Sequence, residues 1–240
     1  MSKKSLPFVT TLAAALVLCV SSPASAVRFH SSSASKYGIA RNSQTNLEGA
    51  LFKATINTIN AYNSPGTSPK FINHEMWLLK GVNQNWIELG FTDGTFTEAS
   101  TGFQGYHYGH FAAEADMDNN GNLTYYVEDR IFGPSTERNS THQWHMQREG
   151  INKDNWALYI NGVKRIVYYA PGPGKAPDVG LETNTLYSAS LDWNERSFQY
   201  NHAGAWRFWG SGQLSVSSGA GIKAIWDVYP TSIFTSKASP

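Results

Sequence analysis

Hydrophobic and polar positions alternate in short runs along most of the chain, and this pattern predicts strands. The clearest run is Trp86 to Thr92, where Ile87 and Leu89 share one face while Trp86 and Glu88 share the other. Further runs follow at short intervals, separated by Gly, Asn, Asp and Pro. They are Met76–Lys80, Tyr106–Ala113, Leu123–Arg130, Gln143–Arg148, Trp156–Ile160, Val163–Tyr169, Gly180–Leu186, Ala205–Phe208 and Ile222–Tyr229. No stretch keeps a 3.6-residue period, so we expect an all-β chain.

Turn signals agree with this interpretation. The Asn161-Gly162 pair between two alternating runs predicts a two-residue type I′ hairpin, and Asn119 to Asn122 predicts a looser second one. The composition includes 21 Gly, 8 Trp, 12 Tyr and 12 Phe, which favours strands and turns over a helical bundle. Short antiparallel strands without helices predict two packed sheets, that is, a jelly-roll sandwich of the concanavalin-like type.

The chain begins with the features of a secretory signal peptide. Lys3 and Lys4 precede an apolar run from Leu12 to Val20, and Ala24-Ser25-Ala26 forms a cleavage site after Ala26. The run is too short to span a membrane. We therefore expect residues 1–26 to be removed and the protein to be secreted. Residues 27–69 are interpreted as a polar arm, with a short pro-segment and a first strand near Leu51–Ile59, and residues 70–240 as one β-sandwich domain.

Charge and cysteine content exclude several classes of function. Removing residues 1–26 takes away two of the 19 Lys and Arg and none of the 18 Asp and Glu, which leaves a net charge of −1. This balance does not favour a nucleic-acid partner. The one cysteine, Cys19, lies in the signal peptide, so no disulfide or thiolate chemistry is expected in the mature chain. We expect a monomer.

Two glutamates are the main candidates for chemistry. Glu182 lies in a second strand, where Val179 and Leu181 suit a core and Glu182 faces the other way, as Glu88 does in its own strand. If the two strands are neighbours, two carboxylates share one cleft, and they titrate as a pair that supplies one acid and one base. The alternative is that both are ordinary residues of a solvated strand face, and spacing alone favours that alternative.

An aromatic-apolar-Glu-apolar-Gly strand, followed much later by an isolated strand glutamate, resembles the glutamic peptidases, which include the fungal eqolisins and the plant neprosins. The resemblance implies a secreted peptidase on a concanavalin-like sandwich, active at acidic pH, with Glu88 and Glu182 as its catalytic pair. The chain has Glu88 where eqolisins have glutamine, and it lacks the cysteines and the long pro-domain of neprosins. We assign substrate binding to Trp77, Trp86, Tyr126 and Glu128, expect a peptide or protein substrate, and expect no cofactor.

Metal chemistry is not favoured. Asp116 to Leu123 opens like a calcium loop, but Val127 stands where a bidentate glutamate belongs, so a polar hairpin turn is the better interpretation. The pairs His107/His110 and His142/His145 are each three residues apart, on opposite faces of a strand, which does not suit a zinc site.

Other functions stay open on the sequence. The first is a non-catalytic carbohydrate-binding protein on the same fold, whose aromatic residues would bind a polysaccharide. A glycosidase ranks below it, because only Glu114-Ala115-Asp116-Met117-Asp118 places carboxylates on one face with short spacing. A structural or surface protein with incidental glutamates is the remaining alternative.

Overall fold

The computed structural model describes residues 36–61, 71–80, 85–98, 101–120, 122–133, 140–150, 152–183, 189–210, 214–218, 222–228 and 232–237. Every regular element in these ranges is a β-strand, and all the strand pairs are antiparallel. The predicted signal peptide, residues 1–26, lies outside the described residues. No helix in the described part of the chain is long and apolar enough to cross a membrane.

The strands form two sheets that share one point of pairing. The first sheet has the order β13 (Leu214–Ser218), β1 (Lys36–Asn42), β10 (Gly174–Thr183), β3 (Phe71–Lys80), β4 (Asn85–Glu98), β5 (Phe103–Met117) and β6 (Leu123–Ile131). The second has the order β14 (Ile222–Val228), β15 (Ser232–Lys237), β11 (Ala189–His202), β2 (Leu47–Ala61), β7 (Thr141–Glu149), β8 (Asn155–Ile160) and β9 (Val163–Tyr169), with β12 (Ala205–Phe208) beside β11. They join where Leu47 of β2 pairs with Gly174 of β10.

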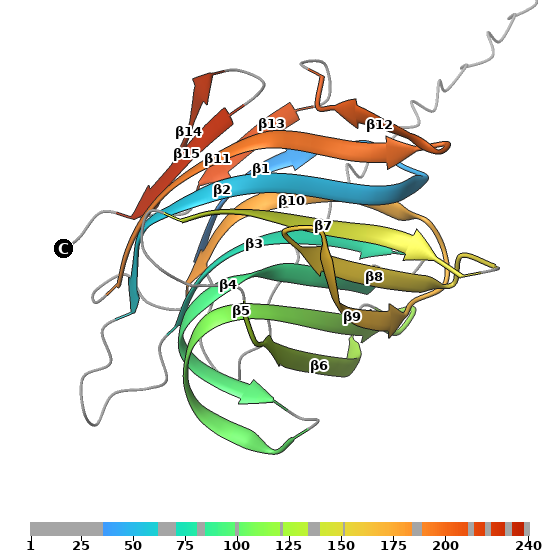
Figure 1. Cartoon of the computed structure of the whole chain (residues 1–240), viewed down its shortest axis with the longest axis horizontal. Helices are drawn as coiled ribbons and strands as arrows, with labels where there is room; N and C mark the ends of the chain where they lie inside the picture. The colour runs from blue at the N-terminus through green and yellow to red at the C-terminus, as the bar shows by residue number, and fades with distance from the viewer. Residues whose placement is uncertain are drawn as a thin grey trace, which may run out of the picture.

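The core lies between the two sheets. Alternate residues of the first sheet, among them Met76 and Leu89, point at Phe52, Trp144 and Leu158 of the second, and all five are fully buried. In Figure 1, β7, β8 and β9 lie in front of β3, β4 and β5, and the far ends of β4 and β5 curl round. The residues between the core positions form the opposite surface of the first sheet, which we call the outer face. The predicted all-β, two-sheet antiparallel sandwich is confirmed.

Turn chemistry and strand ends follow the sequence closely in the middle of the chain. Asn161 and Gly162 both have positive φ, at 51° and 77°, as a type I′ turn between β8 and β9 requires. The turn between β5 and β6 is a polar hairpin in which the Asp118 carboxylate accepts hydrogen bonds from the backbone of Asn120 and Asn122. Its carboxylate is therefore used within its own turn.

The segment before residue 70 differs from its expected form. The sequence predicts that residues 36–42 belong to a polar arm, but they form β1, which pairs with β10 on one side and β13 on the other. The strand expected near Leu51–Ile59 is longer than its apolar residues indicate. It is β2, which begins at Leu47 and pairs with both β11 and β7. The largely polar residues of β1 form a strand because the neighbouring strands β10 and β13 supply its hydrogen bonds.

A buried histidine pair lies between the sheets. The rings of His110 on β5 and His142 on β7 are 4.9 Å apart, and neither ring nitrogen of His110 has a hydrogen-bond partner within the described ranges. Burial, followed by the charges of His142, Arg165 and His107, lowers the pKa of His110 to about 3. The folded protein therefore holds His110 neutral over a range in which an unfolded chain would protonate it.

This burial predicts a loss of stability in acid. Below the unfolded-state pKa of about 6.5 the unfolded chain binds the extra proton, so the free energy of unfolding falls as pH falls toward 3, by up to about 1.4 kcal/mol per pH unit. His110→Phe keeps an aromatic ring in place and removes the titration. Urea midpoints at pH 7 and pH 4.5 should differ less in His110→Phe than in the wild type. If the urea midpoint falls by the same amount between pH 7 and pH 4.5 in both proteins, His110 is not the cause of the acid instability.

Candidate active site

All six residues predicted for the site lie on the outer face of the first sheet, and five of them occupy neighbouring positions. Glu88 on β4 lies directly across from Trp77 on β3, and on its other side Ala113 separates it from Glu128 on β6. Trp86, two residues before Glu88, is separated from Tyr126 by Ala115 in the same way. Directly paired residues of antiparallel strands share a face. These five side chains therefore occupy two adjacent rows across β3, β4, β5 and β6.

Trp86 holds the Glu88 carboxylate. The indole Nε1 donates a hydrogen bond of 2.5 Å to Glu88 Oε1, and the two side chains are 2% and 0% exposed. Trp77 and Trp86 pack with Ile39 and Ala115 into a small apolar cluster beside this carboxylate. Because a bond to one carboxylate oxygen limits how the group can rotate, Trp86 fixes the orientation of the Glu88 carboxylate.

Glu182 lies on the same face but is not a direct neighbour of Glu88. On β10 it is level with Asn73 of β3, whereas Glu88 is level with Trp77. The two residues are offset by four residues along the strand direction and by two strand spacings across the sheet. Together these offsets put their backbone positions about 16 Å apart. The predicted shared face is therefore observed, and a third strand, β3, runs between the two glutamates.

A further glutamate, which was not predicted from the sequence, stands between them on β3. Glu75 on β3 is fully buried, and its direct partners on β4 and β10 are Gly90 and Gly180. Asn73 Nδ2 donates a 3.2 Å hydrogen bond to Glu75 Oε1. The expected strand began at Met76, one residue too late to include it. The alternation Asn73-x-Glu75-x-Trp77 was the signal that could have found it.

A second missed acid, Asp178, is level with Trp77 and Glu88. Arg41 binds its carboxylate through two nitrogens, with Nε to Oδ1 at 2.7 Å and one terminal nitrogen to Oδ2 at 2.5 Å. Burial raises the pKa of Asp178 to about 6, although Arg41 acts in the opposite direction. Asp178 thus joins the outer face as a carboxylate held in a fixed position by a cation.

The acidic run Glu114 to Asp118, considered above for a glycosidase, forms ion pairs with a buried lysine. Glu114 and Asp116 both pair with the buried Lys80 of β3, Asp116 at 3.2 Å. Burial raises the pKa of Glu114, and Lys80 opposes that shift. The single charge of Lys80 offsets part of the negative charge of these two carboxylates, which is a role in the fold. The described residues contain no group of three or more His, Cys, Asp or Glu side chains arranged to hold a metal ion.

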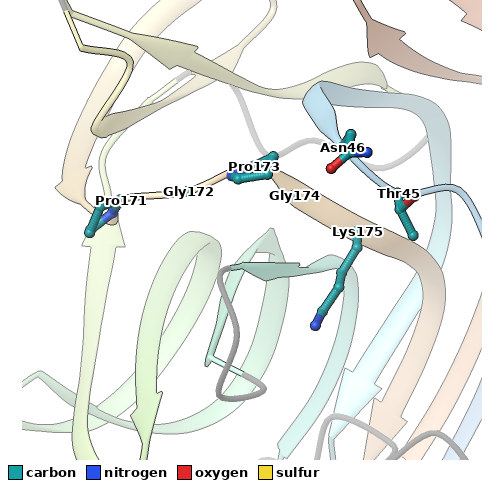
Figure 2. A pocket seen from close by; sticks show the side chains of 7 residues that line it. All are labelled: Thr45, Asn46, Pro171, Gly172, Pro173, Gly174 and Lys175. Carbon is teal, nitrogen blue, oxygen red and sulfur yellow. The ribbon is translucent and has the colours of Figure 1, made fainter.

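One pocket of about 510 Å³ lies apart from these carboxylates. It is lined by Thr45 and Asn46 and by the stretch Pro171 to Lys175, before and at the start of β10 (Figure 2). Lys175 is its one charged side chain, and Figure 2 shows it extending away from Asn46. Its walls are mainly proline and glycine, and none of the carboxyl groups described above lines it.

No protein-family model matches the chain, and no curated protein sequence matches it. The fold is similar to that of scytalido-glutamic peptidase with a transition-state analogue inhibitor, with a TM-score of 0.56 and 10% identity, over 86% of this chain and 100% of that one. A second structure of that peptidase, with a peptide-based transition-state analogue, gives 0.49 and 11% over 86% and 100%. The kappa-carrageenase of Pseudoalteromonas carrageenovora, in complex with an oligotetrasaccharide of kappa-carrageenan, gives 0.32 and 11% over 83% and 79%.

These comparisons define a class of fold. At 10% identity, the similarity to the first structure shows a shared antiparallel β-sandwich architecture and nothing about activity. The other two matches have TM-scores below 0.5 and add nothing to that conclusion. The chain is therefore an antiparallel β-sandwich whose fold is similar to that of scytalido-glutamic peptidase.

Proposed function

We propose that this protein is a secreted hydrolase of the glutamic peptidase type, which cleaves peptide bonds at acidic pH with carboxyl groups of the outer face. The observation that carries the proposal is the position of Glu88 and Glu182 on that face, both almost fully buried, with Trp77 and Trp86 beside Glu88. Buried carboxyl groups in a fixed arrangement suit general acid and base catalysis. The shared fold with scytalido-glutamic peptidase is consistent with this proposal.

The proposed reaction uses the two glutamates in opposite protonation states. Ionised Glu182 removes a proton from a water molecule whose oxygen attacks the scissile carbonyl carbon. Protonated Glu88 donates a hydrogen bond to the carbonyl oxygen and stabilises the negative charge that develops there. The carbon–nitrogen bond then breaks, and the departing amine leaves with one proton from the pair. Trp86, bound to Oε1 of Glu88, holds this carboxyl group in a fixed orientation.

The carbohydrate-binding alternative finds less support on this face. Sugar rings stack on flat aromatic faces that solvent can reach. Trp77 and Trp86 are 3% and 2% exposed, and both pack into the same small apolar cluster. Neither therefore offers a ring face that solvent can reach. No described feature of the outer face favours a polysaccharide over a peptide. A monomer that acts on peptide or protein chains remains the proposal.

The direct test is proteolysis by the purified mature chain. An unfolded protein substrate is incubated with it from pH 3 to pH 8, and new termini are identified by mass spectrometry. Cleavage with an optimum on the acid side, lost in a Glu88→Ala/Glu182→Ala double variant of native fold, is expected. Absence of cleavage at every pH, or equal cleavage by the double variant, would refute the proposal.

A further inference from the structure

The distance between the two predicted catalytic glutamates raises a physical problem. Their backbone positions are about 16 Å apart, so Glu88 and Glu182 are too far apart to share one proton directly. Glu75 is a diagonal neighbour of both. It pairs with Gly90, which is two residues from Glu88 on β4, and with Gly180, which is two residues from Glu182 on β10. Diagonal neighbours in a sheet are about 7–8 Å apart, within reach of two glutamate side chains.

The glycines beside Glu75 keep this route open. A Cβ atom added at Gly90 would lie 2.2 Å from the backbone oxygen of His74 and 2.5 Å from Glu75 Cβ, so no larger residue fits there. Gly180 stands on the other side of Glu75. Both direct neighbours of Glu75 lack a side chain, so neither of these two positions places one between Glu75 and the diagonal glutamates.

Two buried polar atoms on the same strand face point to a ligand at this place. Asn73 Oδ1 and Trp77 Nε1 flank Glu75, and neither has a hydrogen-bond partner within the described part of the chain. Buried polar atoms normally have partners. An extended peptide carries a backbone donor and acceptor on each residue, so it would supply a partner to each of these two atoms. Glu75 therefore lies where a peptide substrate would be bound.

From this geometry we propose that Glu75 couples Glu88 and Glu182 by passing a proton between them. The inference rests on the proposed function. In each turnover the oxygen of water bonds to the carbonyl carbon and its proton goes to Glu182. The carbon–nitrogen bond breaks, and the amine takes the proton of Glu88. Glu75 then carries the proton from Glu182 back to Glu88, which restores the starting state. Glu75 is a positioning residue, because it acts through the other two carboxyl groups.

Other charged groups also face this cluster and bear on its titration. Asp178 is the other acidic neighbour of Glu75 across β10, and it is paired with Arg41. Further out on the outer face are Glu128, beyond Ala113, and Arg130, which is paired with Glu98. Glu128 is a useful comparison, because it lies on the side of Glu88 that is remote from Glu182.

The test compares Glu75→Gln with Glu128→Gln by two readouts. In the first, Glu75→Gln should lower kcat by on the order of tenfold with little change in KM and should shift both limbs of the pH profile. In the second, ¹³C NMR of labelled glutamate carboxyl groups follows titration without substrate. Glu75→Gln should move the midpoints of both Glu88 and Glu182 by on the order of one pH unit, whereas Glu128→Gln should move that of Glu88 alone.

The outcomes separate this inference from the proposed function. If the wild type cleaves peptides and Glu75→Gln keeps its pH profile and both midpoints, the coupling is refuted and the peptidase proposal stands. If the wild type cleaves nothing, the peptidase proposal fails, and the NMR midpoints decide whether the three carboxyl groups are coupled. If Glu128→Gln moves the titration midpoint of Glu182 as much as Glu75→Gln does, the shift reflects the general charge of the face, and the coupling is refuted. Should Glu75→Gln fail to fold, Glu75→Asp is titrated in its place.

Discussion

Replacing Glu182 by glutamine is expected to lower kcat for peptide cleavage by roughly 10²–10⁴-fold, the usual contribution of a general base. An amide cannot accept the proton of the attacking water, so the loss should be present at every pH. Glu88→Gln should behave differently, because an amide still donates a hydrogen bond to the carbonyl oxygen. We expect it to keep part of the activity and to lose the alkaline limb of the pH profile, since its donor no longer ionises.

Initial rates on one peptide substrate, measured across the pH range, check both variants. Glu149→Gln is a suitable control, because Glu149 lies on β7 of the second sheet and pairs with the partly exposed Lys164. It should retain wild-type rates. Wild-type rates in Glu182→Gln would contradict the assignment of the base. The assays belong in the range where the protein stays folded, which burial of His110 narrows on the acid side.

Replacing Gly90 by alanine is expected to be the most destabilising single methyl addition on the outer face. The added Cβ would meet the backbone oxygen of His74 at 2.2 Å and the Glu75 backbone Cα at 2.6 Å. Backbone atoms in the middle of a sheet cannot move away as a flexible side chain does. We expect a loss of about 3 kcal/mol or more in the free energy of unfolding, at or above the upper end of ordinary overpacking.

Urea midpoints of Gly90→Ala and Gly210→Ala give the comparison. An added Cβ at Gly210 would meet no atom within 4 Å, so this control should unfold close to the wild type. The same midpoint for both variants would mean that β3 and β4 are not as close at Glu75 as the structure has them. Because Gly90 also borders Glu75, a folded Gly90→Ala protein should show altered carboxyl titration as well.

The strands of the middle of the chain could be predicted well, because their signals are local. Trp156–Ile160 and Val163–Tyr169 correspond to β8 and β9 within one residue, since an Asn-Gly turn fixes the pairing of its two strands. The missed strands have other causes. β1 and β11 are rich in polar residues, and their strand form depends on neighbours that are far away in the sequence. Strand propensity is weak where pairing partners decide the outcome.

The strand faces of the candidate residues could be predicted, but their distances could not. Alternation correctly placed Trp86 and Glu88 on one face, and the direct contact of the indole nitrogen with the carboxylate follows from their two-residue spacing. Alternation also placed Glu182 on a polar face. Glu75 was missed because the expected strand began at Met76, although Asn73, Glu75 and Trp77 alternate in the same way.

The sequence by itself determined which side of each strand carries acids and which side carries apolar residues, because that choice follows from the two-residue period of a strand. The tertiary structure decided how the strands are aligned with one another. The registers of β4 and β10 against β3 set Glu182 two rows away from Glu88 and place Glu75, with a glycine on either side, between them. These registers depend on hydrogen bonds and core packing between segments up to a hundred residues apart, and no local pattern contains that information.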